Sequence, residues 1–149
     1  MPVAGRAVAA LAAAAGLALG LAAPATAAPG GGRPFTVELT GEAEVNAQGV
    51  PNQGDLDGTG TAHVTVNPGT GLVCWTIEVD GIEPVLAAHI HVAPSTEPGP
   101  VVVPLSPYSG GCTTVDRELA REIVRSPEDY YVNVHTATYP AGALRGQLG

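Results

Sequence analysis

The sequence predicts an all-β domain, a β-sandwich or barrel that carries one short helix. Short runs in which apolar and polar residues alternate recur from residue 35 onward, and this is the period of a half-buried strand. Turns rich in Gly and Pro separate the runs at regular spacing, as is typical of sandwiches and barrels. A single segment, residues 115–125, has the apolar spacing of a helix.

The clearest strand pair is a hairpin near the middle of the chain. Residues 62–66 and 73–79 both alternate, and residues 67–71 between them read Asn-Pro-Gly-Thr-Gly. Two alternating runs joined by a short Pro-Gly turn are typical of a β-hairpin. Residues 35–39 alternate in the same way and predict an earlier strand. Trp75 occupies an apolar position of the hairpin, so we expect it in the core.

The second half of the domain is expected to hold four more strands and the helix. The strands are predicted over residues 84–92, 101–105, 130–136 and 144–148. Pro104 cannot donate to a sheet and indicates an edge or a strand end. The apolar stripe of the helix consists of Val115, Leu119 and Ile123. Thr113 or Thr114 is expected to cap this helix, and Pro127 to end it.

The order of segments predicts an exported chain with one domain. Arg6 precedes an apolar run over residues 7–23, and Ala25-Thr26-Ala27 then supplies the small residues of a cleavage site. The run is rich in Ala and Gly and at the lower length limit for crossing a bilayer, so we expect no stable membrane insertion. The predicted organisation is a signal peptide (1–27), a flexible lead-in (28–34) and one β-domain (35–149), secreted or at the cell surface.

The charge of the exported part argues against two classes of partner. The chain has no lysine, and without Arg6 it keeps five arginines against fourteen acidic residues, a net charge of −9. This charge repels nucleic acid and anionic membrane surfaces. It suits cation binding, although solubility is the simpler explanation. The expected partner is an extracellular protein or another extracellular ligand.

The two cysteines, Cys74 and Cys112, are expected to form a disulfide. In an exported chain a pair of thiols is usually bonded. The alternative is a redox or metal-binding thiolate pair. The separation of 38 residues and the lack of a C-x-x-C motif argue against that alternative.

The histidines provide the one candidate metal site. His89 and His91 are two residues apart in a predicted strand, so both side chains leave the same face. In the strand over 130–136 two valines take the core side, which leaves Tyr131, Asn133 and His135 on the other face. If these strands are neighbours, three imidazoles converge, and imidazole is a good ligand for copper and zinc.

Other interpretations of these residues stay open. The histidines also suit a buried polar network without an ion, in which they hydrogen-bond carbonyls or stack on tyrosines. His63 lies on the polar face of its own strand and is a poorer fourth ligand. Asp55 and Asp57 lie in a Gly-Asp-Leu-Asp-Gly stretch whose spacing does not fit an EF-hand calcium loop. No serine lies in a nucleophile-elbow pattern, so we assign no catalytic residue.

Three stretches together resemble the CHRD domain, the module named after chordin. They are AHIHVAP (88–94) followed by GPVVVPL (99–105), YYVNVHT (130–136) and YPAGALRGQL (139–148). The resemblance covers residues 35–149 and implies an extracellular, immunoglobulin-like β-sandwich. Together with the predicted export and the lack of a complete catalytic constellation, it leads us to expect a non-enzymatic binding module. The growth-factor binding of chordin is not carried over, because this sequence has one such domain and lacks the cysteine-rich modules associated with that binding.

The histidine pattern is also similar, more distantly, to that of Cu/Zn superoxide dismutases. In those enzymes an H-x-H strand and a later V-x-H strand supply copper ligands, which here implies His89, His91 and His135. No histidine lies between His91 and His135, where the enzymes hold their bridging and zinc ligands. Arg145 loosely matches an anion-steering arginine; hydrogen bonds to loop carbonyls or an ion pair are its alternative role. The same choice, structural or anion-contacting, applies to Tyr131 and Asn133. The alternative function is therefore a copper-binding or dismutase-like protein.

Overall fold

The structure, a computed structural model, describes residues 1–2 and 31–149, so nearly all of the predicted signal peptide and part of the lead-in lie outside the described residues. The elements are β1 (Arg33–Thr40), β2 (Thr59–Asn67), β3 (Leu72–Asp80), β4 (Ala87–Val92), β5 (Val101–Pro104), β6 (Gly110–Thr114), α1 (Arg117–Arg125), a 3-10 turn η1 (Pro127–Asp129), β7 (Tyr130–His135) and β8 (Leu144–Gln147). An all-β fold with one short helix is thus confirmed. In the described part of the chain, no helix is long and apolar enough to cross a membrane.

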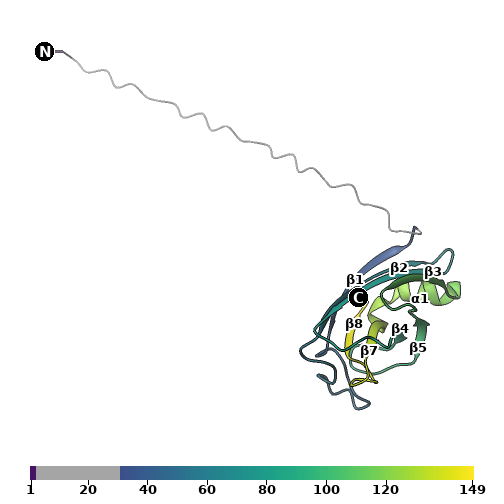
Figure 1. The fold of residues 1–149 in the computed structure, drawn as a ribbon. Coiled ribbons are helices and arrows are strands. Elements are labelled where there is room, and N and C mark those ends of the chain that lie inside the picture. Colours follow the sequence, from purple (N-terminus) through teal and green to yellow (C-terminus); the bar gives the residue numbers. More distant parts are fainter. Residues whose placement is uncertain (3–30) are drawn as a thin grey trace.

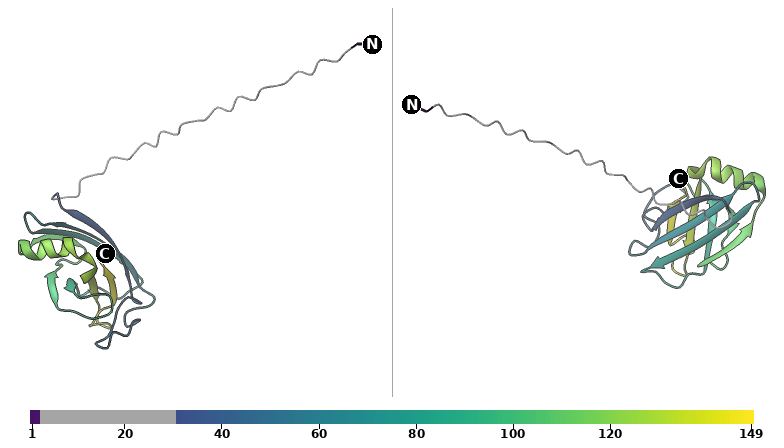
Figure 2. Two further views of the ribbon diagram at one scale, coloured as in Figure 1. Left: turned by 180° about the vertical axis from the view of Figure 1, so that it is seen from behind. Right: turned by 90° about the horizontal axis from the view of Figure 1, so that it is seen from above.

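The strands form one antiparallel sheet in the order β5-β4-β7-β8-β1-β2-β3-β6. The sheet is continuous, because β1 joins β8 through the pair Thr40 and Arg145. It curls so that β1, β2 and β3 lie on one side of the core and β4, β7 and β8 on the other (Figure 1). Seen from above, the strands of the two layers cross (Figure 2). The sandwich therefore consists of two halves of one curled sheet.

The core lies between the two halves, and strand alternation places its residues there. One buried cluster includes Val37 and Val64 from the first half and Ile90, Val132 and Val134 from the second. Trp75 belongs to it, as predicted, and is 4 % exposed. Because alternate residues of a strand face opposite sides, the polar residues between these positions stand on the outer faces of the sheet.

The helix begins later than the sequence predicts. It starts at Arg117, and Asp116 caps it by accepting a hydrogen bond from the Glu118 amide at 2.7 Å. The prediction of a Thr113 or Thr114 cap was wrong, because both lie in β6. An Asp at the N-cap satisfies an unpaired amide as well as Thr does, so the sequence left several possible starts.

Strand β6 was missed, and β1 begins two residues earlier than expected. Two glycines open β6 and remove the apolar alternation by which the other strands were found. The strand pairs with β3, and this pairing sets Cys74 directly opposite Cys112, where the structure contains the predicted disulfide. At the other end of the domain, β1 extends into the predicted lead-in, where Arg33 pairs with Val66.

Candidate functional site

Antiparallel pairing of β4 and β7 brings the three predicted histidines together. His89 lies opposite Asn133, His91 opposite Tyr131, and Ala87 opposite His135. We call His89, His91 and His135 the histidine cluster; one ring nitrogen from each lies within 4.8 Å of the other two. His63 is exposed on β2, where its Nδ1 lies 3.2 Å from the Thr36 hydroxyl, and it does not join the cluster.

The cluster stands on the sheet face opposite the hydrophobic core, yet His91 is buried and His89 and His135 are half-buried. His91 is 8 % exposed, and Asn133 beside it 1 %. Two loops cover this face. The β1–β2 loop brings Glu44 against Asn133, and the β4–β5 loop brings Gly99 against His91. The result is a second, polar interior on the outside of β4 and β7.

Backbone carbonyls assign the tautomers of two imidazoles. His91 Nδ1 lies 2.8 Å from the Gly99 carbonyl oxygen, and His135 Nδ1 lies 3.1 Å from that of Pro140. A carbonyl oxygen only accepts, so both Nδ1 atoms carry the proton and both Nε2 atoms keep a lone pair. His89 Nδ1 lies 3.0 Å from His135 Nε2 and donates to it in the neutral cluster.

One of these lone pairs is buried and unused. His91 Nε2 has no hydrogen-bond partner among the residues that the structure describes. Burial lowers the pKa of His89, His91 and His135. For His91 the hydrogen bond to Gly99 opposes this shift, and the charges of His89 and Arg145 add to it. The neutral imidazole, which is the form that ligates metals, is therefore favoured at all three positions.

The donor set fits a transition-metal ion. With metal–nitrogen bonds of about 2.0–2.1 Å, adjacent ligands lie about 3 Å apart and opposite ligands about 4 Å. The 3.0 Å between His89 Nδ1 and His135 Nε2 matches an adjacent pair, and His89 would bind through Nδ1 once its proton has moved to Nε2. All three ligand atoms lie within 4.8 Å of one another, a span slightly above that of an opposite pair. Three imidazoles suit copper or zinc and not calcium or magnesium, which prefer oxygen.

Tyr131 and Arg145 lie beside the cluster and were suggested by sequence as structural or anion-contacting residues. The Tyr131 ring stacks on His91 with centroids 4.8 Å apart and planes at 9°. The Arg145 guanidinium carbon lies 3.5 Å from the Tyr131 ring centroid. Arg145 is 1 % exposed and donates hydrogen bonds to Pro94 O at 2.8 Å, Glu97 O at 3.0 Å and the Gln147 side chain. It contacts loop carbonyls in this structure.

Glu44 is a buried carboxyl that sequence reasoning missed. It is 3 % exposed and accepts hydrogen bonds from the Val45 amide at 3.1 Å and from Asn133 Nδ2. Burial raises the pKa of Glu44, although these hydrogen bonds and the Arg145 charge oppose the shift. Glycine at position 142 lets the backbone lie close to the Glu44 carboxylate, because a Cβ there would lie 2.1 Å from Glu44 Oε2. Glu44 lies 89 residues from Asn133 in the sequence, so no local pattern indicates its role.

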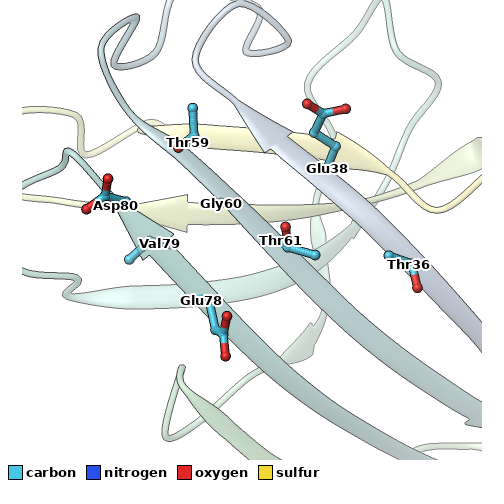
Figure 3. A pocket seen from close by; sticks show the side chains of 8 residues that line it. All are labelled: Thr36, Glu38, Thr59, Gly60, Thr61, Glu78, Val79 and Asp80. Atoms are coloured by element: carbon cyan, nitrogen blue, oxygen red, sulfur yellow. The ribbon is translucent and has the colours of Figure 1, made fainter.

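Away from the histidine cluster, a shallow pocket lies on the outer face of β1, β2 and β3 (Figure 3). It is open, has a volume of about 700 Å³ and presents Thr36, Glu38, Thr61, Glu78 and Asp80 among its lining residues. The carboxylates stand apart from one another in Figure 3. In the described part of the chain, the histidine cluster is the one group of three or more His, Cys, Asp or Glu side chains whose ligand atoms lie close enough to share an ion.

Comparison with known families agrees with the fold and the motifs. A family model for the CHRD domain matches residues 35–148, which include every buried residue of the core and the histidine cluster. No curated protein matches the chain, and no solved structure does. The likeness to Cu/Zn superoxide dismutases therefore stays a prediction. Because the match spans nearly all the described residues, the chain belongs to the CHRD domain family.

Proposed function

We propose that this chain is a non-enzymatic binding module that works outside the cell. Membership in the CHRD family carries the proposal, since such domains are extracellular modules. The disulfide supports an oxidising environment. The polar groups around the cluster support binding rather than catalysis, because Arg145 and Tyr131 are engaged with loop backbone.

The non-enzyme part of this proposal is tested by the reaction that the histidine pattern suggests. The purified chain, loaded with copper, is assayed for superoxide turnover beside its His135→Ala variant. We expect the two proteins to give the same rate, equal to that of the same copper bound to unfolded chain. A higher rate for the wild-type chain that the variant loses would overturn the proposal.

A second candidate function, transition-metal binding, is favoured by one observation. His91 Nε2 is buried with its lone pair free and lies in a cluster with two other imidazoles. A buried acceptor without a partner costs about 1–3 kcal/mol, and a metal ion would supply that partner. Copper is the ion we favour, because imidazole is a strong ligand for it and the first-row affinities peak at copper.

Calorimetry on the purified chain tests this candidate. We expect one copper ion per chain, with the affinity reduced more than about tenfold in His89→Ala and in His135→Ala. His63→Ala is the matched control, because His63 is exposed on β2 outside the cluster. Binding no tighter than about millimolar, or equal losses in the control, would exclude the site.

A further inference from the structure

Two groups hold the His91 ring, and they are linked to each other. Its Nδ1 proton is accepted by Gly99 O at 2.8 Å, and its face is covered by Tyr131. The Tyr131 hydroxyl in turn accepts the Gly99 amide proton at 3.1 Å. Gly99 therefore bridges the two parallel rings, because its carbonyl binds one and its amide binds the other.

Arg145 holds the same arrangement from the opposite side. Strand β7 lies between β4 and β8, so His91 and Arg145 approach Tyr131 from different sides. The guanidinium packs against the Tyr131 ring and also donates to Pro94 O and Glu97 O. These carbonyls belong to the β4–β5 loop that carries Gly99. Arg145 thus restrains both the ring and the loop on which His91 depends.

The loop approaches β4 so closely that its bridging position requires glycine. A Cβ on Gly99 would lie 1.9 Å from the Val92 carbonyl oxygen. No real Cβ is found at this distance, so the Gly99 backbone is set by contact with the strand that bears His91. The acceptor of the His91 proton is therefore part of a rigid assembly.

We infer that Tyr131 and Arg145 are positioning residues of the metal site and act through His91. This inference rests on the proposed metal binding. They hold the imidazole in the Nδ1–H tautomer with Nε2 directed to the ion. A histidine that donates its other N–H to a carbonyl is oriented and made more basic, and losing such support typically reduces metal affinity 10- to 100-fold. Neither residue contacts the ion itself.

Two variants of Tyr131 separate positioning by the ring from positioning by the hydroxyl. Tyr131→Phe keeps the stacked ring and removes the bond to Gly99, and we expect its copper affinity to fall by less than about tenfold. Tyr131→Leu removes the ring, and we expect a loss of about tenfold or more. Tyr130→Phe is the control, because Tyr130 lies on the core face of the same strand. We expect no change in this control.

Nitrogen-15 NMR of the His91 imidazole in the metal-free chain supplies a readout that a merely structural role would not move. We expect one tautomer, Nδ1–H, in the wild-type chain and in Tyr131→Phe, and a mixture in Tyr131→Leu. Arg145→Lys keeps the charge but loses the planar stack, and we expect the same mixture there. If Tyr131→Leu does not fold, Arg145→Lys decides by the same two measurements.

The outcome that overturns the inference is a folded Tyr131→Leu or Arg145→Lys chain with wild-type copper affinity and a single Nδ1–H tautomer. A wild-type chain that binds no copper defeats the proposed metal site instead. The two failures are distinguishable, because the tautomer is measured without metal.

Discussion

Breaking the Cys74–Cys112 disulfide is expected to remove much of the stability of this domain. The bonded residues are 38 apart in sequence, and the chain-entropy relation gives about 3.9 kcal/mol for a loop of this length. Total unfolding free energies are about 5–15 kcal/mol, so the loss is large. Strand β6 is also an edge strand paired only with β3, so its place in the sheet depends on this bond more than that of the inner strands.

The assay is urea and thermal unfolding of the wild-type chain and the Cys74→Ser/Cys112→Ser double variant, each with and without reductant. About 120 ordered residues have an unfolding entropy near 0.25 kcal/mol/K, so the expected fall in Tm is about 15 °C. Reductant should lower the stability of the wild-type chain and leave the variant unchanged. A difference below about 1 kcal/mol between the oxidised and reduced wild-type chain would refute the loop-entropy reasoning.

Three further changes test the packing around the site and the core. Glu44→Gln is expected to raise the unfolding free energy at pH 7. Burial raises the pKa of Glu44 above its ordinary value of 4.5, so the neutral carboxyl is the form that favours folding. The stability it contributes is complete below pH 4.5 and is lost as the pH rises through the raised pKa. Gly99→Ala is expected to destabilise the chain by about 2 kcal/mol in urea unfolding, because its Cβ would meet Val92 O at 1.9 Å. Trp75→Phe should cost about 1–2 kcal/mol by the same measurement, because it removes the hydrogen bond from Nε1 to Pro107 O at 3.0 Å.

Each of these changes has its own control or contrary outcome. For Glu44→Gln, a gain that persists undiminished at pH 4 would show that charge burial is not its cause. Gly69→Ala is the control for Gly99→Ala, because its Cβ would meet only the Asn67 side chain at 3.2 Å. Unchanged stability in Trp75→Phe would mean that the Pro107 carbonyl finds another donor.

Local alternation predicted the faces of the strands well. Val132 and Val134 face the core, and Tyr131, Asn133 and His135 therefore share the other face. The same method failed for β6, because Gly110 and Gly111 carry no apolar side chain. It also failed for the helix cap, because Asp116 and the two threonines before it are all residue types that can cap a helix.

Long-range pairing decided the composition of the site. The strand order sets β4 beside β7 and so joins His135 to the other two histidines, while His63 remains on the other half of the sheet. Glu44 enters the same region from a loop 89 residues away from Asn133. Contacts at this separation depend on register and topology, which alternation within one strand does not specify.

The sequence by itself determined the all-β class, the pairing of the two cysteines and the face of each strand on which a histidine stands. These follow from composition and from the two-residue period of a strand, which are local properties of the chain. Only the tertiary structure decided that one continuous sheet forms both halves of the sandwich, that two loops cover the outer face of β4 and β7, and that the Tyr131 ring packs against both His91 and Arg145. These depend on which distant segments pack together. Burial there lowers the pKa of each histidine of the cluster, and hydrogen bonds to loop carbonyls set the tautomers of His91 and His135.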